Sequence, residues 1–179
     1  MTTASLLPAA RNKRHGYSSY QIALHWTVVG LVAFQWFLGQ QMTATVDALE
    51  AATAGGPPVT NLGAAYVHIA FGITILIVML ARLAAKLRRP VQVAPDSDHP
   101  WARTLGTINH WAFYAVLIGL PVLGAIGWFG GSELAKNVHA FVANVLPWLI
   151  ALHVLGALTH QFVFRDRLIN RIVRDGPGN

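Results

Sequence analysis

Cysteine is absent from this sequence of 179 residues. Its absence excludes disulfide bonds, iron–sulfur clusters held by thiolates, and covalent haem attachment through a C-x-x-C-H motif. Histidine occurs eight times, and it is therefore the one side chain with good affinity for transition metals that is present in number.

Charge is also scarce in this chain. Asp, Glu, Lys and Arg make up 11% of the residues, against about 25% in an average soluble domain. Hydrophobic residues make up 54%, which indicates a membrane protein. The first residues, MTTASLLPAARNKRH, lack the apolar core of a signal peptide, so we expect the first helix to act as an uncleaved insertion signal.

Long apolar stretches define the expected fold. A helix that crosses a bilayer needs about 20 mainly apolar residues, and four stretches meet this requirement. They are Tyr20–Leu38, Leu62–Leu83, Trp111–Phe129 and Val138–Phe164. Pro121 and Pro147 fall inside the last two, where neighbouring helices can satisfy the backbone groups that proline leaves free. The sequence predicts an all-α fold, a transmembrane four-helix bundle at 19–165, with an N-terminal arm at 1–18 and a basic tail at 166–179.

The basic residues indicate how this bundle is oriented. All but Lys136 of the 13 lysines and arginines lie in three groups outside or at the ends of the apolar stretches. They are Arg11, Lys13 and Arg14; Arg82, Lys86, Arg88, Arg89 and Arg103; and Arg165, Arg167, Arg171 and Arg174. Because such residues are enriched on the cytoplasmic side, both termini and the middle loop are predicted to be cytoplasmic. This distribution explains the net charge of +6 without a nucleic-acid partner, and the lipid bilayer is the expected environment.

Six histidines lie within or at the ends of the predicted spans, where ionisable residues usually have a function. They are His25, His68, His110, His139, His153 and His160. His139 and His153 are 14 residues apart, so an α-helix places them on nearly the same face, separated by about 21 Å along its axis. That distance is too long for one metal ion but suits two cofactors at different depths.

The expected depths pair these histidines across the bundle. His25 and His153 fall in the cytoplasmic half, whereas His68 and His139 fall in the outer half. Two haem b groups, each held by two neutral imidazoles, explain the set, and iron with both axial positions filled is suited to one-electron transfer. For any single histidine, helix packing or a hydrogen bond between helices is an alternative. A haem-free, proton-coupled transporter that uses histidines as a relay is the alternative for the whole set.

The chain resembles the bacterial cytochrome b561 family, which is related to the b-type cytochrome subunits of nickel–iron hydrogenases. The matching stretches are YSSYQIALHW, VHIAFGITILIVMLARL, HWAFYAVLIGLPVLG, HAFVANVLPWLIALHVLGALTHQF and FRDRLINRIV, in this order from about Tyr17 to Arg174. The resemblance implies a di-haem protein of the bacterial inner membrane, with His25, His68, His139 and His153 as the axial ligands. It also implies quinone as an electron partner.

Three further residues are candidates for contacts near the cytoplasmic haem. His110 and His160 could exchange protons with a quinone or quinol, although hydrogen bonding at the membrane interface is the alternative for His110. Arg82 could pair with a haem propionate or extend to the lipid headgroups, and the sequence favours the headgroups slightly.

The predicted function is electron transfer between the quinone pool and a partner at the periplasmic face. Some members of the family that the chain resembles are associated with superoxide oxidation coupled to quinone reduction. The alternatives within this function are a membrane anchor for a larger periplasmic oxidoreductase and electron exchange with a small redox protein.

Overall fold

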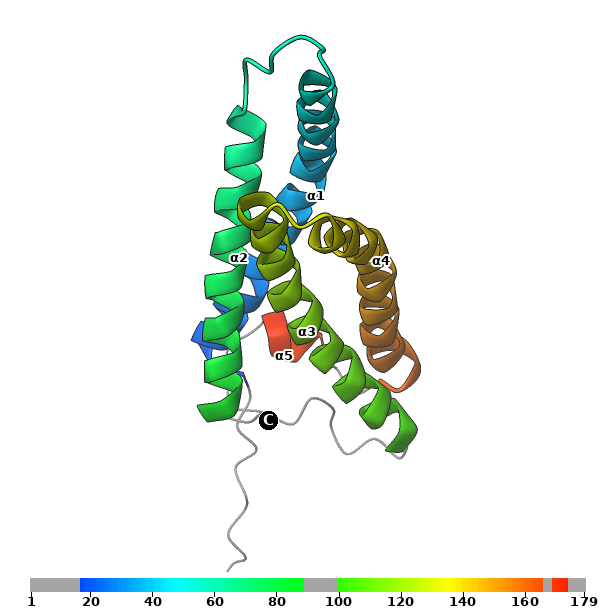
Figure 1. Cartoon of the computed structure of the whole chain (residues 1–179). Coiled ribbons are helices and arrows are strands. Elements are labelled where there is room, and N and C mark those ends of the chain that lie inside the picture. Colours follow the sequence, from blue (N-terminus) through cyan, green and yellow to red (C-terminus); the bar gives the residue numbers. More distant parts are fainter. Residues whose placement is uncertain (1–16, 89–99, 166–168, 174–179) are drawn as a thin grey trace, which may run out of the picture.

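The computed structural model of the chain describes residues 17–88, 100–165 and 169–173, and within these ranges it contains helices and no strand. The four long helices are α1 (Ser19–Thr53), α2 (Gly63–Arg88), α3 (Pro100–Gly130) and α4 (Glu133–Leu158) (Figure 1). A π-helical turn, η1 (Thr159–Val163), continues α4, and a short helix, α5 (Asn170–Val173), follows. Each long helix is long and apolar enough to cross a membrane, which confirms the predicted all-α fold with four spans.

The two ends of the chain are described only in part. Of the predicted N-terminal arm at 1–18, only Tyr17 and Ser18 belong to the described residues, and of the predicted tail at 166–179 only 169–173 does. Six of the basic residues used to predict the orientation therefore lie outside the described residues. These are Arg11, Lys13, Arg14, Arg89, Arg167 and Arg174.

The surface of the bundle is strongly apolar. Trp148 is 77% exposed, and many other large apolar side chains are exposed along all four long helices. The buried core is small by comparison and consists of Val28, Ile75, Met79, Tyr114, Leu117, Leu120 and Leu146. An extended apolar surface of this kind suits a bilayer rather than water, because lipid tails take the place of a covering protein layer.

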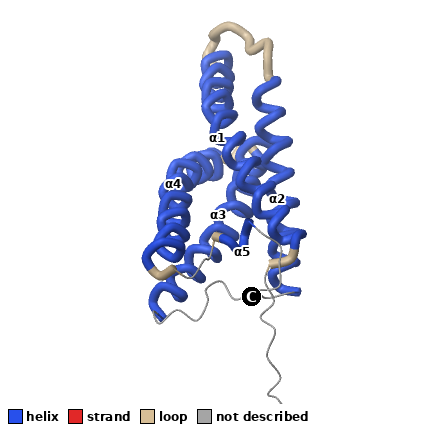
Figure 2. The backbone as a smooth tube through the Cα atoms, turned by 180° about the vertical axis from the view of Figure 1, so that it is seen from behind, coloured by secondary structure: helices blue, strands red, loops and turns tan. Residues whose placement is uncertain are grey.

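Packing between the long helices follows the chain order. Helix α1 packs against α2, α2 against α3, and α3 against α4. In the described residues, α4 has no comparably close backbone packing with α1 or α2. The α1–α2 hairpin extends beyond the turn that joins α3 and α4, as both views of the backbone show (Figures 1 and 2).

Helices α1 and α3 are longer than the apolar stretches that predicted them. Helix α1 continues well past Leu38 to Thr53, because residues 39–53 are rich in Ala, Gln and other good helix formers. It ends before Gly55, whose φ of +94° favours glycine. Helix α3 begins at Pro100 rather than near Trp111, since proline is well tolerated in the first turn of a helix. The apolar stretches thus predicted the part of each helix that lies within the hydrocarbon region, but they did not predict where the helices begin and end.

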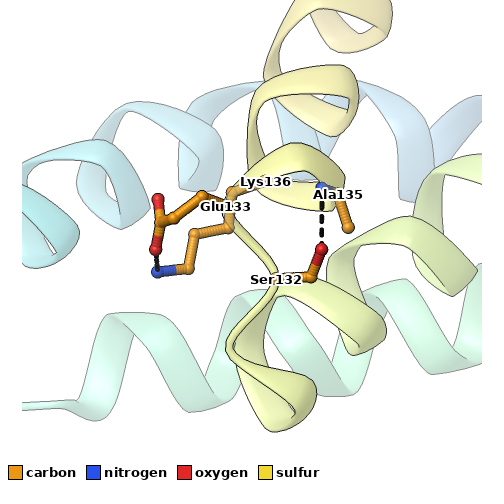
Figure 3. A network of polar contacts seen from close by, with 4 residues as sticks. All are labelled: Ser132, Glu133, Ala135 and Lys136. Atoms are coloured by element: carbon orange, nitrogen blue, oxygen red, sulfur yellow. Dashed lines mark hydrogen bonds and ion pairs between the residues drawn. The ribbon is translucent and has the colours of Figure 1, made fainter.

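A tight turn joins α3 to α4. Gly131 has a φ of +66°, and Ser132 caps α4 by accepting a hydrogen bond of 3.3 Å from the backbone N–H of Ala135 (Figure 3). Lys136 forms an ion pair of 2.6 Å with Glu133 in the same turn. Because the connection is so short, α4 returns directly along α3, and its first turns face the last turns of α3.

Helix α4 changes direction within its length, as is visible in Figures 1 and 2. Pro147 lies inside this helix, and an interior proline removes one backbone hydrogen bond and bends the helix. The first half of α4 carries His139 and the second half carries His153. The bend therefore lies between these two histidines along the chain.

Candidate haem-binding sites

His25 of α1 and His153 of α4 lie together near the end of the bundle where α1 begins and α4 ends. Their ring centroids are 6.4 Å apart, with an angle of 47° between the ring planes. We refer to His25 and His153 as the tail-side pair.

His68 of α2 and His139 of α4 form a second pair, closer to the α1–α2 hairpin. Their ring centroids are 6.2 Å apart, with an angle of 71° between the planes. We refer to His68 and His139 as the hairpin-side pair. The structure thus brings together the same two pairs that the expected depths had indicated.

The separation within each pair suits one metal ion between two imidazoles. Two metal–nitrogen bonds of about 2.0–2.1 Å, plus about 1 Å from each nitrogen to its ring centre, add up to roughly 6 Å. In the described residues, no three side chains among His, Asp and Glu come together as a metal site. Paired imidazoles without further protein ligands fit haem, because the porphyrin supplies the remaining four bonds to iron.

The helices that each pair connects leave room for a flat ligand. Helices α1 and α4, and likewise α2 and α4, lack close backbone packing in the described ranges, so their histidines meet without direct helix contact. Gly156 lies one turn after His153, and a Cβ atom added there would meet nothing within 4 Å. The residues present therefore fit a haem group beside the tail-side pair.

His139 is held by the backbone of α3. Its Nδ1 atom lies 2.8 Å from the carbonyl oxygen of Leu120, and a carbonyl can only accept, so Nδ1 donates the hydrogen. This tautomer leaves the lone pair of Nε2 free to bind iron. Gly124 makes the close approach possible, because a Cβ there would lie 3.1 Å from Cε1 and 3.2 Å from Nδ1 of the His139 ring.

A pocket opens beside the tail-side pair. It combines apolar side chains with titratable ones. The residues that line it are Tyr17, Gln21, Leu24, His25, Arg82, Lys86, His110, Tyr114, His153, Ala157, Ile169 and Ile172. A mainly apolar pocket with a few convergent polar groups is the usual form of a small-molecule site.

Among the remaining predicted residues, His110 and Arg82 belong to this pocket. The His110 ring centroid lies 5.3 Å from that of His153, with the rings nearly perpendicular. Arg82 is half-buried and lies beside Tyr114 in the lining of the pocket. Lys86 lies one turn further along α2, with its Nζ atom 4.4 Å from the centre of the Trp111 ring. The cationic side chains of α2 therefore border the space next to His153.

His160 lies apart from the pocket. Its side chain is buried within η1, and its ring centroid lies 5.2 Å from that of Phe164. It does not belong to the residues that line the pocket. The structure therefore brings His110, but not His160, to the tail-side pair.

The end of the chain forms one wall of the pocket. Ile169 and Ile172 contribute to its lining, and the indole Nε1 of Trp26 donates a hydrogen bond of 3.1 Å to the backbone oxygen of Ile172. This bond attaches α5 to α1 next to His25.

Sequence reasoning did not identify two polar residues that contact the histidines. Asn109 is buried on α3, and its Nδ2 atom lies 3.2 Å from Nδ1 of His153. Gln35 on α1 donates a hydrogen bond of 2.9 Å from Nε2 to the backbone oxygen of His68. Both are amides within apolar helices, and that unusual placement was the signal that could have identified them.

Comparison with known proteins gives these pairs a context. The family model for prokaryotic cytochrome b561 matches residues 16–175. Cytochrome b562 of Cereibacter sphaeroides is 32% identical over 165 residues, covering 89% of this chain and 96% of the relative.

Two further relatives have lower identity and similar coverage. A protein named probable superoxide oxidase CybB from Yersinia pestis is 28% identical, covering 88% of this chain and 95% of the relative. Cytochrome b561 homolog 1 of Escherichia coli is 25% identical, covering 88% and 96%. The chain belongs to the prokaryotic cytochrome b561 family and is a multi-pass b-type cytochrome that takes part in electron transfer in the inner membrane.

Proposed function

We propose that the chain binds two haem b groups, one at each histidine pair, and carries electrons between a quinone and a partner at the opposite face of the membrane. The observation that carries this proposal is the presence of two imidazole pairs, with centroid separations of 6.4 and 6.2 Å, that share helix α4. When bound, such a haem accepts and releases one electron at a time and offers no free position for O₂. Membership in a family of b-type cytochromes leaves the haem-free transporter without support.

We propose further that the tail-side end of the bundle faces the cytoplasm. The described cations at this end are Arg82, Lys86, Arg88, Arg103 and Arg165. At the hairpin end, Lys136 is the one cation in the described part of the chain. This asymmetry supports the predicted placement of both termini in the cytoplasm.

The pocket beside the tail-side pair is the proposed quinone site. Reducing a quinone to a quinol takes two electrons and two protons, so a proton-exchanging group has to lie close to the electron donor. His110 meets this requirement, because it lines the pocket next to His153. His160 is the weaker of the two candidates because it lies outside the lining.

Arg82 is the proposed partner of an anionic group in this pocket, such as a haem propionate. Its side chain is half-buried beside His25 and His153 and interacts with Tyr114. This placement favours a carboxylate inside the protein over the lipid headgroups that the sequence slightly favoured.

Superoxide is one candidate for the partner at the outer face, and the name of the Yersinia pestis relative supports it. In that reaction two superoxide anions would give two electrons to one quinone, which takes up two protons, yielding two O₂ and one quinol. Charge does not support it: the described hairpin end carries Asp47, Glu50 and Glu133, and Lys136 is already paired with Glu133. A surface of this kind does not attract an anion.

A redox protein, or a larger periplasmic oxidoreductase for which the chain is the anchor, is the second candidate. The α1–α2 hairpin extends beyond the α3–α4 turn and offers a surface outside the expected hydrocarbon region (Figure 1). The negative charge of this end suits a partner with a positive docking surface.

The proposal is tested with the purified protein in detergent or nanodiscs. A haem assay should give two haem b per chain, and reduced-minus-oxidised spectra should contain b-type bands that a ubiquinol or menaquinol analogue produces stoichiometrically. Reduction by superoxide, compared with reduction by soluble redox proteins, would then identify the outer partner. One haem per chain, or no reduction by any quinol, would overturn the proposal.

A further inference from the structure

Asn109 forms a side-chain hydrogen bond with His153, one of the two histidines of the tail-side pair. Its side chain is buried on α3, and its Nδ2 atom lies 3.2 Å from Nδ1 of His153. Its Oδ1 atom is buried and has no hydrogen-bond partner in the described part of the chain. A buried amide oxygen without a partner is costly, so this site favours an arrangement in which that oxygen accepts a hydrogen.

The chemistry of an axial ligand determines which amide atom faces the ring. If His153 binds iron through Nε2, then Nδ1 carries the hydrogen and is a donor. An amide NH₂ group facing another donor is repulsive, whereas the amide oxygen accepts the bond. A half-turn of the Asn109 amide about its terminal bond exchanges the positions of Oδ1 and Nδ2 without moving other atoms.

The hairpin-side pair already contains a bond of this kind. His139 donates from Nδ1 to the carbonyl oxygen of Leu120 at 2.8 Å. Both histidines of α4 therefore have an oxygen acceptor available on α3, from the backbone at one pair and from a side chain at the other. A hydrogen bond at Nδ1 raises the basicity of Nε2 and stabilises the oxidised iron.

We infer that Asn109 is a positioning residue for the tail-side haem: through Oδ1 it accepts a hydrogen bond from His153, fixes the orientation of that ring and lowers the reduction potential of this haem relative to a site without the bond. This inference rests on the proposed binding of haem by His153. It concerns a side chain, so substitution can remove or strengthen the bond while leaving the ligand in place.

The test is a redox titration of the full-length protein with haem bound, followed by optical spectra and by electron paramagnetic resonance. Asn109→Leu removes the acceptor at similar volume and should raise the potential of one haem by about 60 mV, which corresponds to a tenfold change in a one-electron equilibrium. Asn109→Asp keeps an acceptor and adds negative charge, so it should lower the potential of the same haem. Asn144→Leu is the matched control, because Asn144 is exposed on α4 and donates to the backbone oxygen of Ala140 in its own helix.

Opposite shifts in the two variants, confined to one of two haem components, would support the inference. Loss of that component in Asn109→Leu but not in Asn109→Asp would also support it, because the acceptor is then needed to hold the ligand. Unchanged potentials, shifts of the same sign in both variants, or loss of the component in both would overturn it. A wild-type protein without two b-type components would instead contradict the proposed function.

Discussion

The two histidine pairs differ in what holds and surrounds them. At the hairpin-side pair, His139 is bound by a backbone carbonyl and lies closely against Gly124, so main-chain atoms define its position. At the tail-side pair, His153 contacts the amide of Asn109, the rings of His110 and Phe113, and a pocket bordered by cations. Backbone contacts are set by the fold, whereas side-chain contacts vary with sequence. We therefore expect the geometry of the hairpin-side pair to be fixed by the fold, and the geometry of the tail-side pair to depend on the side chains around it.

The largest effect is expected from removal of a ligand at either pair. His25→Ala should remove the tail-side haem, and His68→Ala should remove the hairpin-side haem, because each leaves iron with one protein ligand. The haem content should fall from two to one per chain in each variant, with a different spectral component lost. If both variants lost the same component, the assignment of two separate pairs would be wrong.

The second effect concerns His110, which has no counterpart at the hairpin-side pair in the described residues. His110→Gln keeps a polar side chain but removes proton exchange, so the rate of reduction by quinol should fall by about 100-fold or more. Both haem components should remain, and reduction by dithionite should proceed as before. A greater loss in His160→Gln than in His110→Gln would show that the wrong histidine has been assigned to the quinone.

The third effect tests whether the backbone fixes the hairpin-side pair. Gly124→Val would force atoms into the ring of His139, because even a Cβ lies 3.1 Å from Cε1. The affinity for the hairpin-side haem should fall by about 10-fold or more, while the tail-side haem is retained. Gly119→Val on the same helix is the control, since a Cβ there meets nothing within 4 Å. Equal haem loss in the two variants would indicate a general effect on α3.

The smallest effect is expected at the wall that α5 contributes to the tail-side pocket. Trp26→Phe removes the hydrogen bond to Ile172 but keeps an aromatic ring, and one such bond contributes about 0.5–1.5 kcal/mol. The KM for quinol should rise by up to about tenfold, with haem content and potentials unchanged. An altered hairpin-side haem in this variant would contradict the separation of the two pairs.

Much of this fold could be predicted from the sequence, because a bilayer requires about 20 apolar residues per span and few other segments reach that length. The histidine pairing could also be predicted, since the depth of a residue follows from its distance to the end of its span. The ends of α1 and α3 could not be predicted. Polar residues continue these helices outside the hydrocarbon region, and hydropathy does not show whether a polar segment is helical.

Contacts that depend on how each helix is rotated about its own axis could not be predicted from the sequence. Asn109 precedes His110 directly. An amide within an apolar helix indicates a polar contact, but a single sequence does not indicate that His153 is the partner. A spacing of seven residues in an α-helix would place His160 on nearly the same face as His153, and the sequence made His160 a candidate for contacts near the cytoplasmic haem. The chain instead passes through the wider π-helical turn η1, which rotates the following residues away from that face.

The bend of α4 at Pro147 has a consequence for the rate at which electrons cross the protein. Each histidine of α4 lies on a different side of this bend, so in the proposed di-haem protein the bend would contribute to the distance between the two haems. Under this proposal, the contacts with α3 would act on the potential of each haem, whereas the bend at Pro147 would act on the distance that an electron travels between them.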